Sequence, residues 1–313
     1  MKENWTNEVE VKGYVFKHTL AKRVTGPQSK NPGTEFINGE LQIATDAEGI
    51  NVVPVRFSYV TPMTKAGKEN RTYSVLSQII DGKTFETDGT DAPIIRVQSR
   101  IGVNDWLNRD GEMVATKMID GGFVSFIREI GDNPANFKCD MLIINVKENE
   151  VEDGDDYAQL MGYTFNFRGD LIPLTLSTVN PQGIKYFVDQ DITPTDPMLT
   201  TVWGKIVSTT VTSTTETETA WGEVAVQATT RTLRAWNVTG SAPEPMEFDD
   251  ESTITVAEFE KGKQDRVALV AAEKARVEEY RKSQQGNAFD TATTAEEKTV
   301  KAASPTAPSD FVF

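Results

Sequence analysis

The chain has one cysteine, one histidine and no long apolar run, and each shortage excludes a class of protein. Cys139 alone cannot form an intramolecular disulfide and fits a reducing compartment. Together with His18 it cannot build a zinc site of the usual Cys/His kind. No apolar stretch approaches the ~18 residues that a membrane span needs, and the start MKENWTNEVE lacks a signal-peptide core. We expect a cytoplasmic protein that has no membrane segment, metal or cofactor.

Catalytic motifs are equally scarce. Neither GxxxxGK(S/T) nor a GxGxxG after a strand occurs, so phosphate-cradling loops of these kinds are absent. A histidine-dependent triad would need His18, which lies in YVFKHTL and fits a loop or a nucleic-acid-facing position better. A nuclease would need a carboxylate cluster that holds Mg²⁺, and no spacing suggests one. We expect a binding protein rather than an enzyme.

One unusual strand is written twice. VVPVRFSYVTP (52–62) and LIPLTLSTVNP (171–181) align without a gap and share a proline, a serine, a valine and a second proline. VEVKGYVF (9–16) resembles AQLMGYTF (158–165) in the same way. Chance similarity between β-rich segments is the alternative. A repeat predicts that one structural unit occurs twice, with the inner prolines at a sheet edge or a bulge.

The order of expected elements is also repeated. The first copy has alternating strands at 9–16, 36–45 and 52–60, a short helix at 73–80, and strands at 94–103 and 136–148. The second copy has strands at 158–165 and 171–179, a helix at 184–191, and strands at 200–211 and 231–241, with a tight turn at 168–170. This is the order of the OB-fold, a five-stranded Greek-key barrel. We therefore predict a mainly β chain with two tandem OB-fold barrels.

The C-terminal part has a different composition. An acidic linker, PEPMEFDDES, leads into a segment rich in Ala, Glu, Lys and Arg, which favours a helix with a modest stripe at Val267, Val270, Val277 and Tyr280. The last residues are short of large apolar side chains and predict disorder. The expected division is a main binding barrel at 1–150, a second barrel at 151–241, a linker and helix at 242–283, and a disordered tail at 284–313.

Charge is distributed unevenly along this acidic chain, whose net charge is −15. Three stretches of the first barrel, 11–34, 52–68 and 92–104, contain cations and no acid, whereas 157–240 has few cations. A local positive groove is the hypothesis, and ordinary solvated loops are the alternative. Interleaved aromatic rings can stack on bases. The candidate nucleic-acid-binding residues are Lys12, Tyr14, Lys17, Lys22, Arg23, Lys30, Arg56, Lys65, Lys68, Arg71, Arg96, Arg100 and Trp106.

Strand alternation sorts the aromatic residues further. Tyr14 and Phe16 share a face with Lys12, while Phe57 and Tyr59 lie opposite Arg56. Because the cations must reach water, we expect Tyr14 to be exposed and Phe57 to be buried. The tryptophans of the second copy, Trp203, Trp221 and Trp236, fit either base stacking or core packing.

These features resemble the single-stranded DNA-binding proteins of the OB-fold class, most closely those encoded by phages. The resemblance covers 9–240 as a fold pattern, and the chain end as a motif: an acid before an apolar tip that closes on phenylalanine, here Asp310, Phe311, Val312 and Phe313. It implies a protein that coats single-stranded DNA without sequence specificity. It also implies recruitment of replication and recombination proteins through that tip, and it leaves homo-oligomer formation open. The tip departs from the family pattern, with one aspartate and no adjacent proline.

A structural protein of a virion or its assembly is the competing interpretation. The hairpin VSTTVTSTTETETAWGEVAV (207–226), rich in Thr and Val, favours it, whereas the basic stretch 11–34 favours DNA binding.

Overall fold

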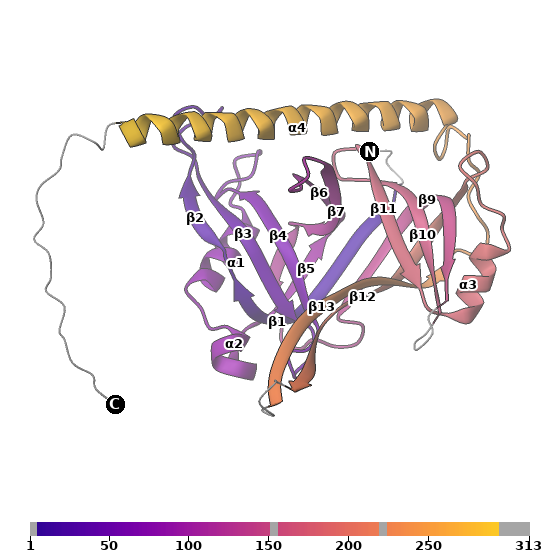
Figure 1. Cartoon of the computed structure of the whole chain (residues 1–313), viewed down its shortest axis with the longest axis horizontal. Coiled ribbons are helices and arrows are strands. Elements are labelled where there is room, and N and C mark those ends of the chain that lie inside the picture. Colours follow the sequence, from indigo (N-terminus) through magenta and orange to yellow (C-terminus); the bar gives the residue numbers. More distant parts are fainter. Residues whose placement is uncertain (1–4, 151–155, 219–223, 294–313) are drawn as a thin grey trace, which may run out of the picture.

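The computed structural model describes residues 5–150, 156–218 and 224–293. Within this part of the chain, thirteen strands pair into one continuous sheet that closes on itself twice. Figure 1 shows the two resulting barrels side by side, with a long helix, α4, lying across both.

The first barrel is formed by strands that pair in the order expected of an OB-fold. Strand β1 pairs antiparallel with β3 and β5, β3 pairs with β4, and β4 pairs parallel with β7, which closes the ring. The fourth and fifth strands of the barrel are each bent into two pieces, β5–β6 and β7–β8, which pair with one another. The bounds are β1 Asn7–His18, β3 Glu35–Ala44, β4 Val52–Val60, β5 Ile94–Ser99, β6 Ile101–Leu107, β7 Met113–Asp120 and β8 Phe123–Phe126.

The second barrel repeats this pairing. Strand β9 pairs with β10 and β12, β10 pairs with β11, and β11 pairs parallel with β13, which also pairs with β12. The bounds are β9 Ala135–Asn149, β10 Tyr157–Phe165, β11 Leu171–Thr178, β12 Met198–Glu218 and β13 Val224–Ser241. The prediction of two tandem OB-fold barrels is confirmed. Antiparallel pairing of β1 with β9 joins the two barrels.

The repeated proline strand occupies the same place in each barrel. It is the third strand, β4 or β11, and the next α-helix follows it: α1 (Arg71–Ile80) or α3 (Pro181–Val188). Both helices begin after an asparagine whose side chain accepts hydrogen bonds from the first turn, Asn70 in α1 and Asn180 in α3. The strand is repeated because the barrel is repeated.

The two prolines lie where a missing N–H costs little. Pro54 faces Gln42 across the β3–β4 ladder, and the pairing of β4 with β7 begins one residue later. Pro173 faces Tyr163, and β11 meets β13 only further along, at Ser177. Each proline therefore has a neighbouring strand on one side, which confirms the edge position rather than a bulge.

Two strand assignments were wrong. Residues 136–148, expected to close the first barrel, lie in β9 and form the first strand of the second. The strand that does close the first barrel, 113–126, was missed because Gly121 and Gly122, both at positive φ, bend it between β7 and β8. In consequence 158–165 is a second strand, whereas 9–16 is a first strand, so these two segments are not equivalent.

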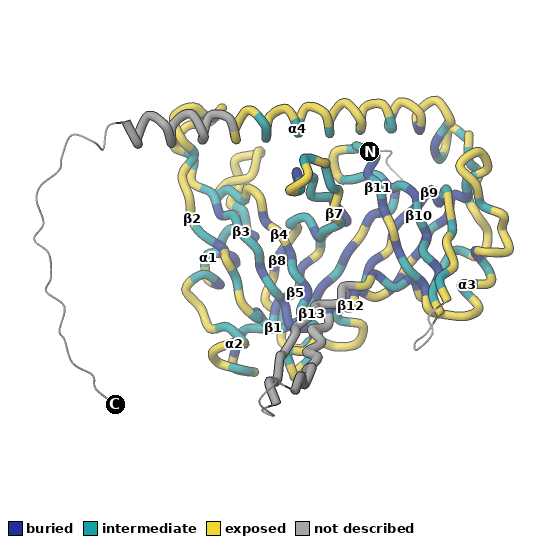
Figure 2. Tube along the Cα trace, in the orientation of Figure 1, coloured by how far each residue is buried: buried dark blue, intermediate teal, exposed yellow. Residues whose placement is uncertain are grey.

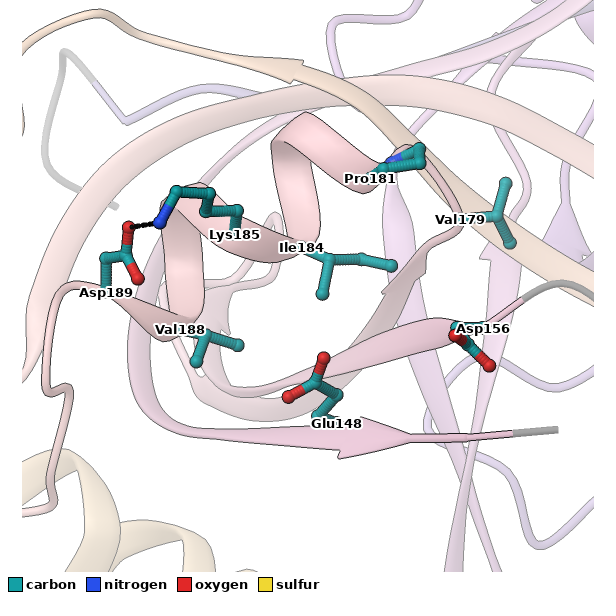
Figure 3. Close-up of a pocket in the computed structure, with 8 residues that line it drawn as sticks. All are labelled: Glu148, Asp156, Val179, Pro181, Ile184, Lys185, Val188 and Asp189. Carbon is teal, nitrogen blue, oxygen red and sulfur yellow. Dashed lines mark hydrogen bonds and ion pairs between the residues drawn. The ribbon is translucent and has the colours of Figure 1, made fainter.

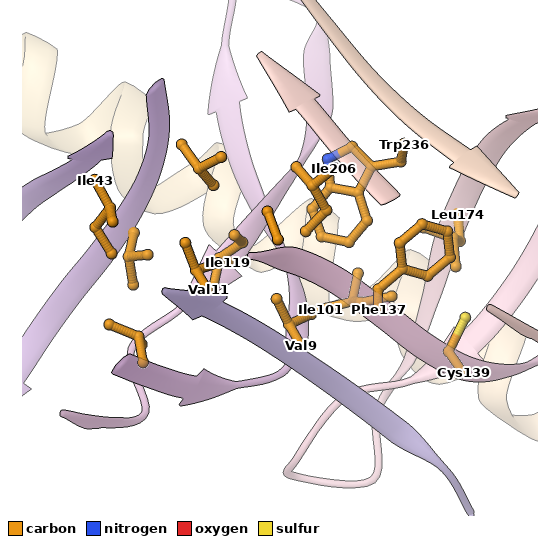
Figure 4. Close-up of a cluster of buried hydrophobic side chains, with 14 of the residues drawn as sticks. Val9, Val11, Ile43, Ile101, Ile119, Phe137, Cys139, Leu174, Ile206 and Trp236 are labelled. Atoms are coloured by element: carbon orange, nitrogen blue, oxygen red, sulfur yellow. The ribbon is translucent and has the colours of Figure 1, made fainter. Parts of the chain in front are cut away.

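A shared core joins the barrels. One cluster of buried side chains runs from the first barrel, with Val9 and Ile119, into the second, with Phe137, Leu174 and Trp236 (Figure 4). The ring centroids of Phe137 and Trp236 lie 5.4 Å apart. Figure 2 shows the buried residues concentrated on the strands.

Polar contacts also cross between the barrels. The buried Asn7 donates to the carbonyls of Ile101 and Phe165 at 3.0 and 2.9 Å. Lys117 on β7 donates to the carbonyl of Thr175 at 2.5 Å and lies 5.6 Å from the ring of Trp236. Burial lowers the pKa of this lysine to about 8. Buried polar groups with such specific partners fix the barrels relative to each other.

The helix α4 (Val256–Thr293) is longer than expected and packs differently. It passes the predicted end at residue 283, and the tail prediction for 294–313 lies outside the described residues. The expected stripe does not form a buried face, since Val267 and Tyr280 are 69% and 65% exposed. Instead Phe259 packs in a small second core against Tyr163 of β10, with ring centroids 5.4 Å apart.

An ion pair holds α4 to the first barrel. Arg266 donates two hydrogen bonds to Asp105 of β6, one of them 2.8 Å long, and both side chains are only 12% exposed. Because its N-terminal turns contact β10 and β11 while Arg266 contacts β6, α4 spans both barrels (Figure 1).

Candidate nucleic-acid interface

In OB-folds, the second and third strands and two loops line the ligand-binding face. In the first barrel these are β3 and β4, the loop at 19–34 after β1, and the loop at 108–112 between β6 and β7. The loop at 19–34 contains a short strand, β2 (Ala21–Val24), which extends the sheet by pairing with the start of β3.

Two aromatic rings meet on this face. The centroids of Phe36 on β3 and Tyr59 on β4 lie 4.8 Å apart at an interplanar angle of 39°, and Tyr59 is 50% exposed. Phe57, two residues away, is buried as expected. A pair of rings with one side open to solvent can stack on an unpaired base.

Cations flank the ring pair on the β2 side. Arg23 lies directly opposite Phe36, and Lys22 lies opposite Ile37. Lys30 is on the turn between β2 and β3, where Thr25 accepts a 2.9 Å hydrogen bond from the N–H of Thr34 and stabilises the turn. All three cations are exposed, and within the described chain none of them forms an ion pair with a carboxylate. Their charge is therefore available to a phosphate.

The loop after β4 adds cations at the same end of the ladder. Met63 and Glu69 form a β-bridge that shapes the loop, and Lys65 and Lys68 are exposed at its tip. Arg71, also exposed, is the first residue of α1. The loop starts where Val60 pairs with Ile37, so its cations lie near the ring pair.

A second group of candidates lies further along the face. Arg56 donates to the Oδ1 of Asn104 on β6 at 2.5 Å. Trp106, 45% exposed, donates from Nε1 to the Oγ1 of Thr116 at 3.0 Å. Partial burial raises the pKa of the nearby Asp120, although the charges of Arg168 and Arg56 oppose the increase. Arg100 is exposed at the junction of β5 and β6.

Three candidate cations are paired with acids that the linear sequence did not suggest as partners. Lys12 lies 3.0 Å from Glu10, and Arg96, directly opposite Lys12, also donates to Glu10. Partial burial raises the pKa of Glu10, but hydrogen bonds and charge from the two cations outweigh it, so the pKa is lowered. Lys17 lies 3.3 Å from Glu86. These cations are less available to phosphate than those of the loops.

Tyr14 was expected to be exposed, but it is half-buried. Its ring lies 5.4 Å from that of Phe85, which starts the short helix α2 (Phe85–Asp88), and Phe16 stacks on the same ring at 6.0 Å. His18 is half-buried, and burial lowers its pKa while a backbone hydrogen bond with Ile79 opposes this. The helix α2 thus covers the outer face of β1.

Some residues of this face escaped the sequence reasoning. Phe36 and Tyr59 were not among the candidates, although both are aromatic residues interleaved with the cations of the first barrel. Arg109 is exposed in the loop at 108–112 and was also missed. The signal was available, because that loop belongs to the known binding face once 113–126 is recognised as a strand.

The second barrel lacks an equivalent set of cations. Thr175 takes the place of Arg56, and the inserted loop with Lys65 and Lys68 is missing because Pro181 starts α3 directly. Trp236 is buried in the core, Trp203 is 40% exposed, and Trp221 lies outside the described residues.

Within the described ranges, no group of three or more His, Cys, Asp or Glu side chains is placed to hold a metal ion. No helix in that part of the chain combines the length and the hydropathy needed to cross a bilayer.

Comparisons with known proteins give one family and a group of similar solved structures, two of which are described here. The family model described as YorF matches residues 6–276. The wild-type single-stranded DNA-binding protein of Thermus aquaticus is similar over 78% of this chain and 95% of its own, at 13% identity and a TM-score of 0.46. A deletion mutant of the Thermus aquaticus protein is similar over 79% of this chain and 98% of its own, at 14% identity and a TM-score of 0.46. A search of the curated proteins finds no match.

Proposed function

The chain belongs to the YorF family, and we propose that it is a non-catalytic protein that coats single-stranded DNA without sequence specificity. The observation that carries this proposal is the exposed ring pair of Phe36 and Tyr59, flanked by Lys22 and Arg23. Stacking on rings requires unpaired bases but no particular base, and loop cations contact the phosphates of any sequence.

The first barrel is the main binding unit in this proposal. Its cations without an acidic partner in the described chain lie on β2, on β4 and the loops beside them, at the start of α1 and at the junction of β5 and β6: Lys22, Arg23, Lys30, Arg56, Lys65, Lys68, Arg71 and Arg100. Trp106 extends the face. A smaller contribution comes from the cations that are paired with Glu10 or Glu86, namely Lys12, Lys17 and Arg96, and from Tyr14, whose ring contacts Phe85.

A fluorescence titration tests the function. Labelled dT and duplex oligonucleotides are titrated with the full-length protein at two salt concentrations. Tight binding of dT, weak binding of duplex and a fall of roughly 0.7 log unit of affinity per log unit of salt for each phosphate contacted support the proposal. Equal affinity for duplex, or a flat salt response, contradicts it.

Recruitment of partners through the C-terminal tip is a further part of the proposal. Phe311, Val312 and Phe313 would fill an apolar pocket on a replication or recombination protein of a host cell, with Asp310 meeting a basic rim. A tether raises the local concentration of the partner near the DNA. Removing 309–313 should abolish pull-down of such proteins and leave DNA affinity unchanged or slightly higher. Unchanged pull-down would show that the tip has no such role.

A structural role in a virion remains the second candidate because of one feature. Strands β12 and β13 stay paired from Thr209 and Leu233 to Glu218 and Val224, so a long hairpin extends beyond the second barrel (Figure 1). Sedimentation velocity separates the two functions. Large, DNA-independent assemblies with no affinity for dT would favour the structural role.

A further inference from the structure

The second barrel has a groove at the end of its third strand, the strand whose counterpart in the first barrel carries Tyr59. Ser58–Pro62 aligns with Ser177–Pro181, each stretch ends the third strand of its barrel, and an asparagine-capped helix follows both. Tyr59 aligns with Thr178, which is buried, and the exposed Val179 that follows it lines a groove.

This groove of about 420 Å³ lies between α3, the end of β9 and Asp156, which precedes β10. We call it the α3 groove. Its apolar lining comes from Val179, Pro181, Ile184 and Val188, which Figure 3 shows along one side of the helix and the preceding turn. Val179 and Val188 are 44% and 39% exposed, so apolar surface faces solvent here. A concave apolar surface of this size accommodates one or two large side chains.

The rim of the α3 groove is acidic. Glu148 and Asp156 stand across from the helix, and Asp189 stands at its C-terminal end (Figure 3). Lys185 is the one cation that lines the groove in the described chain, and its Nζ lies 2.7 Å from Asp189. Burying Ile184 and Phe187 fixes α3 on the barrel and thus holds the rim in place.

The segments that follow the first strand of each barrel differ in the sign of their charge in the sequence. The loop at 19–34 in the first barrel contains three cations, Lys22, Arg23 and Lys30, and no acid. The corresponding stretch ENEVEDGDD (148–156) contains acids and no cation. Because carboxylates outnumber cations in the lining of the α3 groove, a polyanion is repelled from it and a cationic ligand is attracted.

We propose that the α3 groove docks a cationic segment of a protein partner, in which one or two aliphatic or aromatic side chains are flanked by lysine or arginine. The apolar side chains would fill the space beside Ile184 and Val188, and the flanking cations would face Glu148, Asp156 and Asp189. The chain's own tip does not fit, because Asp310 and the terminal carboxylate have the same sign as the rim. The inference goes beyond DNA binding and does not depend on it.

A peptide-binding experiment on the full-length protein tests this proposal. The probe is a fluorescein-labelled Lys-Arg-Leu-Phe-Lys-Arg peptide, and binding is followed by anisotropy. Three unlabelled competitors separate the contributions: Glu-Glu-Leu-Phe-Glu-Glu reverses the charge, Lys-Arg-Gly-Ser-Lys-Arg removes the apolar pair, and Ser-Asp-Phe-Val-Phe reproduces the tip. We expect saturable binding of the probe and at least tenfold weaker competition by each of the three.

Matched variants place the binding on the groove. Glu148→Lys and Val188→Ser should each weaken probe binding about tenfold. Asp132→Lys and Val267→Ser change charge and apolar surface by the same amounts at exposed positions elsewhere and should leave it unchanged. Thermal unfolding of all four variants verifies that they fold.

Several results would overturn the proposal: no saturable binding of the probe, equal binding by the groove variants and their controls, or equally tight binding of the acidic or tip peptide. Displacement of the probe by dT would assign the probe to the DNA face. Loss of probe binding at protein concentrations at which sedimentation shows self-association would assign the groove to a second copy. Because dT affinity is measured on the same variants, failure of this proposal is distinguishable from failure of DNA binding.

Discussion

Neutralising the loop cations of the first barrel should weaken single-stranded DNA binding by a predictable amount. The variant is Lys22→Gln, Arg23→Gln, Lys30→Gln, at three exposed positions that form no ion pair with the described carboxylates. Each cation that contacts a phosphate contributes roughly 0.7 to the slope of log affinity against log salt on a single strand. Three contacts therefore lower the slope by about 2.

The loss of affinity follows from the same slope. Between 1 M and 0.1 M salt, one contact with a slope of about 0.7 contributes roughly fivefold to the affinity. Three contacts contribute on the order of 100-fold at 0.1 M salt. Because Lys22 and Arg23 project from β2 and Lys30 from a turn, each substitution should change the free energy of unfolding by no more than about 0.5 kcal/mol.

The matched control removes the same charge elsewhere. In Lys17→Gln, Lys185→Gln, Lys205→Gln, the first two lysines are already paired with Glu86 and Asp189, and the third lies on the second barrel. We expect less than a fivefold loss and a nearly unchanged slope. Anisotropy of labelled dT across a salt series measures both. Equal losses in the two triple variants would refute the assignment, since the protein's overall field rather than a local site would then determine affinity.

Three further predictions concern stacking and stability. Tyr59→Ala should weaken dT binding by roughly 1–3 kcal/mol without changing the salt slope, and an unchanged affinity would exclude stacking on this ring. Burial lowers the pKa of Lys117 from 10.5 to about 8, so the unfolded chain binds more protons between these values and the free energy of unfolding should rise with pH from about 8 to about 10.5. Lys117→Met should flatten that rise in denaturant titrations, and an identical pH dependence would contradict the assignment. Arg266→Gln leaves the largely buried Asp105 without its partner, so the free energy of unfolding should fall by roughly 2–4 kcal/mol. A change within error would show that α4 is held by its apolar end alone.

The strands that sequence predicted best were those with a distinctive local pattern. The proline in β4 and β11 and the asparagine-capped helices after them are local signals, and they located the third strand of each barrel. The closing strand of the first barrel has no such signal, because Gly121 and Gly122 divide it into short pieces. The continuous apolar run Met141–Ile143 in β9 indicates a buried strand without saying which barrel it belongs to.

The candidate site was predicted in part for a similar reason. An acid-free stretch of sequence finds cations, but their partners come from neighbouring strands: Arg96 reaches Glu10 only because β5 pairs with β1. Covering of Tyr14 by Phe85 likewise depends on where α2 packs, which alternation along β1 does not encode. Loop cations are the easier prediction, because they point into solvent whatever the strands do.

The local charge of the two barrels accounts for how an acidic protein would bind a polyanion in the proposed function. At physiological salt a charge is screened beyond about 8 Å, so affinity depends on the cations next to the bound phosphates and little on the net charge of −15. Acids placed around the α3 groove therefore cost the first barrel little affinity. They would repel a DNA strand from the groove, which could otherwise compete with the first barrel for it. If both proposals hold, duplicating the barrel and reversing the charge near one copy has given one architecture two binding sites of different specificity.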